Sequence, residues 1–286
     1  MRTAWAILLA LMTGGCGDQL KAPPDAANDG NAAADGDVVF DAATPDGRPL
    51  GQIDGLCTGQ PTGPRVLVYT YENLWRHYSN YDARLALYDM CETRGFNVTT
   101  TNDPHAINAT RLADFDVVVF SITSGPGIDA QGLADFEAWL RAGHGMVGLH
   151  SASATEPDWT FYYDNIGARF AGHVPGMQEA QVLIMPGHPI TDGLPITYLH
   201  TDEWYFFQTP PEDNTDMQML LALDESTLPS DYPEQYKVGY HPIGWAHEKL
   251  GGRVFYTALG HNPQTFEDPI ALELIGRAVE WAAHKR

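Results

Sequence analysis

Basic residues are scarce in this sequence. Its 286 residues include 16 Lys and Arg against 37 Asp and Glu, which gives a formal net charge of −21 at pH 7. A surface of this charge repels phosphate backbones and anionic lipids. From Arg65 onwards the Lys and Arg residues are scattered, and only Lys285 and Arg286 are adjacent, so no basic patch offsets the repulsion locally. We therefore expect no nucleic-acid partner and no binding of a membrane surface by the folded domain.

The N-terminus lacks an apolar run long enough to cross a membrane. The run Ala4–Met12 is too short for a bilayer core of roughly 30 Å. Because Arg2 precedes it and the small residues Gly14 and Gly15 follow it, the run is typical of a secretory signal. The chain is therefore expected to be exported.

The signal ends in a pattern similar to a bacterial lipobox, in which small residues precede a cysteine that becomes lipid-modified. Here that cysteine is Cys16, and Thr13 replaces the usual Leu. We expect residues 1–16 to form a signal peptide with a lipobox. The chain would then be a membrane-anchored lipoprotein, in the periplasm or at the cell surface. Ordinary signal cleavage and secretion is the alternative.

Large apolar side chains are nearly missing from residues 17–64, which are rich in Ala, Asp, Gly and Pro. Such a segment cannot bury enough surface to offset its ordering entropy, so it is predicted to be a disordered acidic linker. Cysteine is also rare, with three residues in the chain. If lipid occupies Cys16, then Cys57 and Cys91 remain in an oxidising compartment, where they could pair or stay as separate thiols.

From Arg65 onwards, short apolar runs alternate with amphipathic stretches. Strands are expected at Arg65–Thr70, Asn97–Thr101, Asp116–Ile122 and Gly145–His150, and helices at Tyr81–Arg94, Ala109–Ala113 and Asp129–Arg141. Residues 97–101 are less apolar than the other strands, so they should lie nearer an edge. The alternation predicts an α/β fold, a doubly wound and mostly parallel sheet in flavodoxin-like order, as a single domain over residues 65–286.

The second half of this domain has a different pattern. Further strands are expected at Gln181–Met185, Met217–Leu223, Ile243–His247 and Arg253–Ala258, followed by a closing helix at Ile270–His284. Gly251 and Gly252 favour a hairpin between the last two strands. The long segment Pro186–Pro211 has little regular period, and we interpret it as a functional loop.

The stretch GMVGLHSASA, residues 145–154, is the first candidate site. An apolar strand ends at His150, and the small residues after it suit the sharp turn of a nucleophile elbow. Ligands bind at the carboxyl ends of strands in such sheets. An imidazole there can act as base, acid or metal ligand near neutral pH.

Other polar residues follow strand ends and are expected to face the same cleft. Glu203 or Asp202 with His150 would make an acid/base pair, with His77 as a further catalytic candidate. Since Asp202 and Glu203 are adjacent on an extended backbone, one of them, not both, should enter the cleft. His77, His150 and His173 could instead hold a divalent metal such as zinc, although no local ligand spacing supports a metal.

Substrate-binding candidates lie beside these positions in the sequence. They are Trp159, Trp204, Tyr205, Ser151 and His261. Aromatic faces suit the C–H faces of sugar rings, but aromatic residues at this density are also common in a core.

Several segments together resemble one known family. The stretches GLHSASATEPDW, HPITDGLP, TDEWY, HPIGWAHE and RVFYTALGHNPQTFEDP are similar to those of ThuA-like (trehalose utilisation) domains, in the family's order. The resemblance implies a fold like that of class I glutamine amidotransferases, whose elbow carries a cysteine nucleophile. Here His150 occupies the elbow, so thiolate amidotransfer is excluded.

The resemblance implies carbohydrate catabolism, with a disaccharide or a 3-keto-glycoside as the small-molecule partner. Two hypotheses follow: an exported enzyme (hydrolase, lyase or isomerase) using acid/base or metal-assisted chemistry, and a non-catalytic carbohydrate-binding module at the cell surface. The number of titratable groups at strand ends favours the enzyme, because a binding module needs few convergent His residues.

Overall fold

The computed structural model describes residues 62–284. Nine strands form one sheet in the order β2-β1-β3-β4-β11-β10-β9-β6-β7. The parallel half consists of β2 (Asn97–Thr101), β1 (Arg65–Tyr69), β3 (Val117–Ser121), β4 (Gly145–Leu149) and β11 (Arg253–Thr257). The antiparallel half consists of β10 (His241–His247), β9 (Gln218–Asp224), β6 (Gln178–Ile184) and β7 (Thr197–Asp202). A separate two-stranded sheet pairs β5 (Phe170–Gly172) with β8 (Phe206–Phe207).

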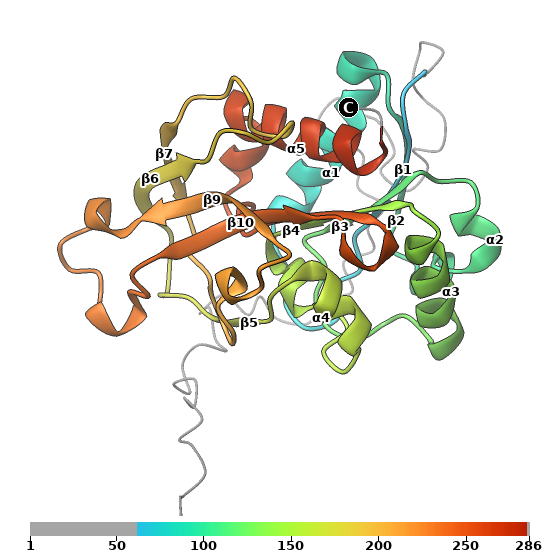
Figure 1. Ribbon diagram of the computed structural model, residues 1–286, viewed down its shortest axis with the longest axis horizontal. Coiled ribbons are helices and arrows are strands. Elements are labelled where there is room, and N and C mark those ends of the chain that lie inside the picture. Colours follow the sequence, from blue (N-terminus) through green and yellow to red (C-terminus); the bar gives the residue numbers. More distant parts are fainter. Residues whose placement is uncertain (1–61, 285–286) are drawn as a thin grey trace, which may run out of the picture.

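Helices cover both faces of the large sheet, so the domain has three layers (Figure 1). One face carries α1 (Ser79–Arg94) and α5 (Pro269–Ala282), and the other carries α2 (Ala109–Leu112), α3 (Ala130–Arg141) and α4 (Thr160–Ile166). Short 3₁₀ helices are η1 (Pro104–Ala106), η2 (His150–Ala154), η3 (Pro211–Asp213), η4 (Glu225–Thr227), η5 (Glu234–Tyr236), η6 (Lys249–Gly251) and η7 (Pro263–Phe266).

Local sequence signals explain where the helices begin and end. The Asp129 side chain accepts a hydrogen bond from the Gly132 amide at the start of α3, and Asp268 accepts from Ile270 and Ala271 at the start of α5. Helix α1 ends at Gly95, whose φ of 70° favours glycine. The sequence predicted the start of α3 at Asp129 and the end of α1 at Arg94, and it placed the start of α5 at Ile270, one residue after the observed Pro269.

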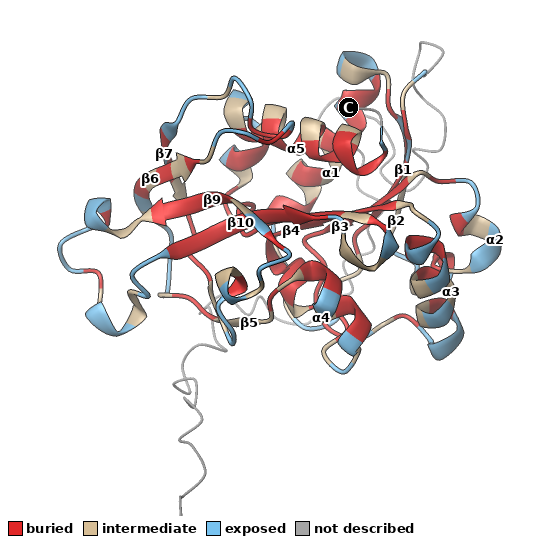
Figure 2. Cartoon of the chain, in the orientation of Figure 1, coloured by how far each residue is buried: buried red, intermediate tan, exposed pale blue. Residues whose placement is uncertain are grey.

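The core lies along the middle of the sheet. Strands β3 and β4 are buried along their whole length, as expected for parallel strands covered on both faces, and Figure 2 shows the helices buried on their sheet-facing sides. The order β2-β1-β3-β4-β11 is the flavodoxin-like order predicted, with residues 97–101 at the edge. The hairpin between residues 243–247 and 253–258 is also confirmed, as β10 and β11.

One prediction about the fold was wrong. The segment Pro186–Pro211 is not a loop without regular structure, because it contains β7 and β8. Strand β7 buries Tyr198, His200 and Asp202 and exposes Leu199. Since two of its three inward side chains are polar and an apolar one points outward, the usual alternation of apolar and polar residues is missing.

The predicted signal peptide, the lipobox at Cys16 and nearly all of the linker 17–64 lie outside the described residues, as does Cys57. Cys91 on α1 is disulfide-bonded, so its thiol is not free. Within residues 62–284, no helix combines the length and the apolar character needed to cross a bilayer.

Candidate functional site

His150 lies at the sharp turn between β4 and η2. Its φ is 51°, in the left-handed region that few residues other than glycine adopt, and its side chain is fully buried. The loop after β11 packs directly against it, because Gly260, with a φ of 137°, would place an added Cβ 3.1 Å from the Cβ of His150. The strained turn and the close packing fix the direction of the imidazole.

The two ring nitrogens of His150 have different partners. Nδ1 lies 2.8 Å from the Ala258 carbonyl, which can only accept, so Nδ1 carries the proton. Nε2 of the neutral ring then accepts from the Tyr205 hydroxyl at 2.6 Å. Burial, followed by the nearby His77 and His261, holds the pKa of His150 well below its usual value. The ring is therefore neutral near pH 7, with its lone pair on Nε2.

His77 reaches the same place from the loop after β1. Its ring centroid lies 5.0 Å from that of His150. Glu72 holds the residue twice, because Oε1 accepts from the His77 amide at 2.8 Å and lies 3.2 Å from Nδ1. Ser124 anchors the loop, accepting from the Trp75 amide at 3.0 Å and donating to its carbonyl at 2.8 Å. Loop and ring are thus positioned by two polar residues.

His261 comes from the loop after β11, and Asp202 at the end of β7 holds that loop. The Asp202 carboxylate accepts from the amides of Gly260, His261 and Asn262 at 2.8, 3.0 and 3.2 Å. It also accepts from the Thr265 hydroxyl at 3.2 Å. Asp202 is fully buried and positions the backbone of the site.

Glu203 is the carboxylate that enters the cluster of histidines. Its oxygens lie 3.8 Å from Nε2 of His150, 3.6 Å from Nδ1 of His173 and 3.0 Å from Nδ1 of His261. Its side chain is 4% exposed, while that of His261 is 26% exposed. The cluster therefore opens to solvent beside His261. As the backbone alternation predicts, only one of Asp202 and Glu203 faces these rings.

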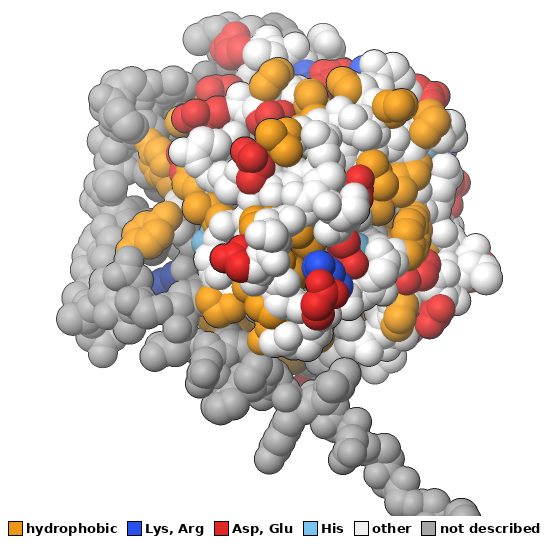
Figure 3. Space-filling view, turned by 90° about the vertical axis from the view of Figure 1, so that its left-hand side faces the viewer, with side chains coloured by type: hydrophobic (Ala, Val, Ile, Leu, Met, Phe, Trp, Pro, Cys, Tyr) orange, Lys and Arg blue, Asp and Glu red, His pale blue; other side chains and the backbone are white. Residues whose placement is uncertain are grey.

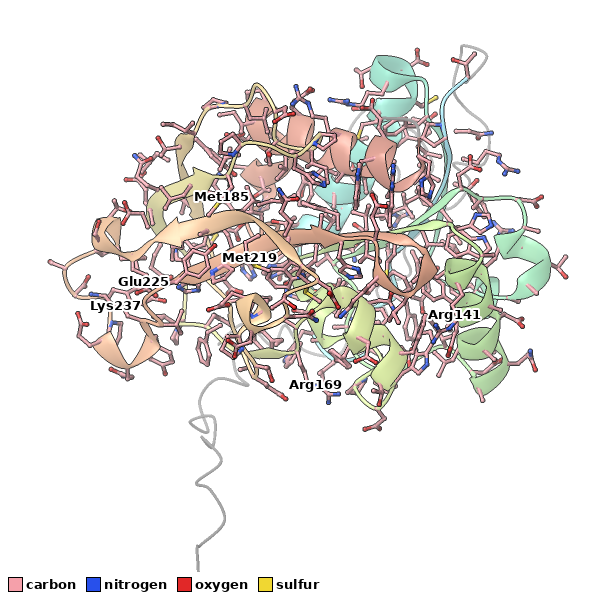
Figure 4. All side chains as sticks on the ribbon, viewed as in Figure 1. Arg141, Arg169, Met185, Met219, Glu225 and Lys237 are labelled. Atoms are coloured by element: carbon pink, nitrogen blue, oxygen red, sulfur yellow. The ribbon has the colours of Figure 1, made fainter. Side chains whose placement is uncertain are left out.

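The small sheet β5–β8 brings His173 and Tyr205 together. His173 follows β5 and Tyr205 precedes β8, and their rings lie 5.7 Å apart. The Tyr205 carbonyl accepts from Nε2 of His241 at 2.9 Å, and Nδ1 of His241 lies 2.8 Å from Glu225. Figure 4 shows Glu225 beside Lys237 in the loops between β9 and β10. Those loops therefore contribute to the position of Tyr205.

The structure changes the proposed trio of metal ligands. His77, His150 and His261 place one ligand atom each within 4.8 Å of one another, and His173 is not among them. Nδ1 of His173 lies near Oε1 of Glu203, whereas His150 and His261 lie near Oε2. The sequence showed that both His173 and His261 follow strands but could not show on which side of Glu203 each ring lies.

The proposed substrate-binding residues are placed differently from one another. Tyr205 and His261 lie in the cluster. Trp204 is 1% exposed and donates to the Gln178 carbonyl, so its ring belongs to the core. Trp159 is partly buried and packs edge-on against Phe136 at the margin of the core. Ser151 is buried, and its hydroxyl has no hydrogen-bond partner among the described residues.

Sequence reasoning did not find Glu72 or the contact between Tyr205 and His150. The signal for Glu72 was a carboxylate five residues before His77 in the same polar loop, YENLWRH. A cavity of about 380 Å³ lies elsewhere, lined by His188, His247, Glu248, Arg253 and Trp281 among others. This cavity includes none of the clustered histidines, so the candidate site is the cluster around Glu203 and not the cavity.

Comparison with known proteins identifies the family of this domain. The sequence matches the ThuA family, described as trehalose utilisation, over residues 65–282. The chain belongs to this family. The resemblance drawn from the sequence segments is thereby confirmed. No curated protein matches the chain.

Two solved structures resemble this ThuA domain. A ThuA-like protein from Bacteroides uniformis is 20% identical with a TM-score of 0.65, and the alignment covers 77% of this chain and 92% of that one. A ThuA-like protein from Parabacteroides merdae is 20% identical with a TM-score of 0.59, covering 78% and 90%. At this identity the likeness shows the fold alone.

Proposed function

We propose that this ThuA domain is an exported enzyme of carbohydrate catabolism that transfers protons on a disaccharide or a keto-glycoside. One observation carries the proposal. A buried carboxylate, Glu203, lies within 4 Å of three histidines at the strand-end elbow, and one of them, His150, has its Nε2 lone pair directed at the Tyr205 hydroxyl. Side chains that can accept and donate protons gather here in a way that a binding surface does not need.

Each group has a distinct role in the proposed reaction. On a keto-glycoside, Nε2 of His150 takes a proton from the carbon next to the keto group, and the electrons of that C–H bond move to the carbonyl oxygen. Glu203, 3.8 Å away, stabilises the positive charge that the ring then carries. The substrate displaces the Tyr205 hydroxyl from Nε2, and this hydroxyl then donates to a substrate oxygen. The proton on His150 returns to the product.

The family supports the substrate class. Its description relates the chain to trehalose utilisation. The elbow carries His150 rather than a cysteine, so no thiolate is available there for acyl transfer. The competing proposal is a non-catalytic carbohydrate-binding module, but Trp204, one of the aromatic residues suggested for stacking on a sugar, is buried in the core, and Trp159 is partly buried against it.

The test compares turnover of trehalose, related disaccharides and their 3-keto derivatives by the wild type and by His150→Asn. Asparagine tolerates the positive φ of this position better than alanine does, so the turn is preserved. We expect at least about a 100-fold loss of kcat, the usual contribution of an acid/base group.

His188→Asn is the matched control, because His188 is also buried but lines the separate cavity. It should keep wild-type turnover. If the wild type binds these sugars but turns none of them over, the binding module is the correct function. If His150→Asn keeps full activity, the proposed site is wrong.

A further inference from the structure

We propose that His77, His150 and His261 form a binding site for one divalent first-row transition-metal ion, with Zn²⁺ as the best match. The site coincides with the proposed active site and deepens its function. Ion binding is measured without substrate, so the two proposals can fail separately. The chain could turn over a sugar without binding an ion, or bind an ion without turning over a sugar.

The three rings are arranged as an ion requires. Their centroids lie 5.0 Å apart for His77 and His150, 5.4 Å for His77 and His261, and 5.5 Å for His150 and His261. One nitrogen from each lies within 4.8 Å of the other two. Nitrogens bound to one zinc at about 2.1 Å in tetrahedral geometry are about 3.4 Å apart. Small side-chain rotations therefore bring all three into bonding range.

The outer nitrogens of two rings are already held as in known metal sites. Nδ1 of His150 donates to the Ala258 carbonyl, and Nδ1 of His77 lies 3.2 Å from the Glu72 carboxylate. A metal-binding histidine usually donates its other ring N–H to a carbonyl or carboxylate, which fixes the tautomer and the ring orientation. In both residues this leaves Nε2 as the ligand atom. At His150 the ion takes the position now filled by the Tyr205 hydroxyl. Because a metal-bound Nε2 cannot accept a proton, Glu203 would take the substrate proton in place of His150 when the ion is bound.

Charge and access also suit a catalytic ion. Three neutral imidazoles carry no charge, while Glu72 and Glu203 place two carboxylates directly against the rings. Together they offset the two positive charges of the ion. His261 is partly exposed, so the fourth coordination position faces solvent, as in zinc sites that act on a substrate. The ion would polarise a sugar oxygen there.

The test measures binding of Zn²⁺ alone to the chelator-treated full chain, by calorimetry and by the shift in the thermal unfolding midpoint. We expect one ion per chain and a higher midpoint. His77→Ala and His261→Ala should each bind at least about 100-fold more weakly, and Glu72→Gln about 10 to 100-fold more weakly, since it holds the ligand from behind.

His173→Ala is the control, because His173 is a nearby histidine that also touches Glu203 but lies outside the trio. It should bind zinc as the wild type does. The inference is overturned if the wild type binds no zinc, if His173→Ala weakens binding as much as His261→Ala, or if Glu72→Gln has no effect. Circular dichroism of each variant separates loss of binding from loss of folding.

Discussion

Asp202 and Glu203 are neighbours in the chain, but their carboxylates face different parts of the fold. Asp202 accepts hydrogen bonds from three amides of the loop that carries His261. Glu203 touches the rings of three histidines. Two residues of the same chemical type therefore have separable effects, one on the stability of the site and one on its chemistry.

We expect Asp202→Ala to lower the free energy of unfolding by about 3 kcal/mol or more, because three buried amides and a hydroxyl lose an ionised acceptor. Glu203→Gln should unfold close to the wild type and lose activity instead. Urea denaturation measures the first effect, and turnover of the keto-glycoside measures the second. Equal destabilisation by both substitutions would contradict this division of roles.

At the scale of elements, β10 anchors the helix that follows the elbow. Trp245 and His247 lie on the same face of β10, since side chains alternate along a strand. Nε1 of Trp245 donates to the Ile166 carbonyl at 2.8 Å, and Nε2 of His247 lies 2.6 Å from the Asn165 carbonyl. These are the last carbonyls of α4, which have no partner inside the helix. Strand β10, in the antiparallel half of the sheet, thus holds the C-terminal end of α4, the helix that follows the His150 turn.

The His247 contact should make stability depend on pH. Burial lowers the pKa of His247 to about 4, from an ordinary value of 6.5. Protonating Nδ1 would also break its bond from the Lys249 amide. As the pH falls, the unfolded chain therefore takes up the proton before the folded chain does. The contribution of neutral His247 to the free energy of unfolding is fully present above pH 6.5 and is lost as the pH falls toward 4. The loss amounts to about 3 kcal/mol.

His247→Gln provides the comparison, since the amide keeps a donor for the Asn165 carbonyl and does not titrate. Chemical denaturation between pH 7 and pH 4 should show a steeper loss of stability in the wild type than in the variant. Taking the difference between the two curves removes the contribution of the other histidines. Parallel curves would show that His247 does not titrate in this range.

At the scale of the whole molecule, the acidic charge affects where the protein can act. On the end of the domain shown in Figure 3, acidic side chains are spread over the surface and basic ones are few. With a net charge of −21, the folded domain should be repelled by anionic membranes and nucleic acids. A lipid on the N-terminal segment would supply a membrane attachment that the charge of the folded domain opposes.

We propose that the exported chain is anchored by lipid at Cys16, as the pattern from Arg2 to Cys16 predicts. Mass spectrometry of the mature N-terminus should find a lipid-modified Cys16 in the membrane fraction. Cys16→Ser should move the protein to the soluble fraction, since this substitution removes the residue that would carry the lipid. An unmodified N-terminus at another residue would leave secretion as the correct prediction.

The sequence by itself determined the parallel half of the domain. Apolar runs in residues 65–69, 117–121 and 145–149, separated by amphipathic helices with caps at Asp129 and Gly95, specify buried strands and their connections through local patterns. Those patterns also placed His150 at a strand end, and with it the candidate site. Burial and capping depend on residues close in the chain, so they can be predicted from it.

Only the tertiary structure decided which polar groups meet. Tyr205 reaches His150 across 55 residues, and Ala258 reaches it across 108. Strand β7 and the β5–β8 sheet decide that His261, and not His173, lies with His77 and His150. Neither element has the alternation of apolar and polar residues by which a strand is predicted from sequence. Hydrophobic periodicity shows which side chains are buried, but the pairing and register of distant strands decide which side chain each one contacts.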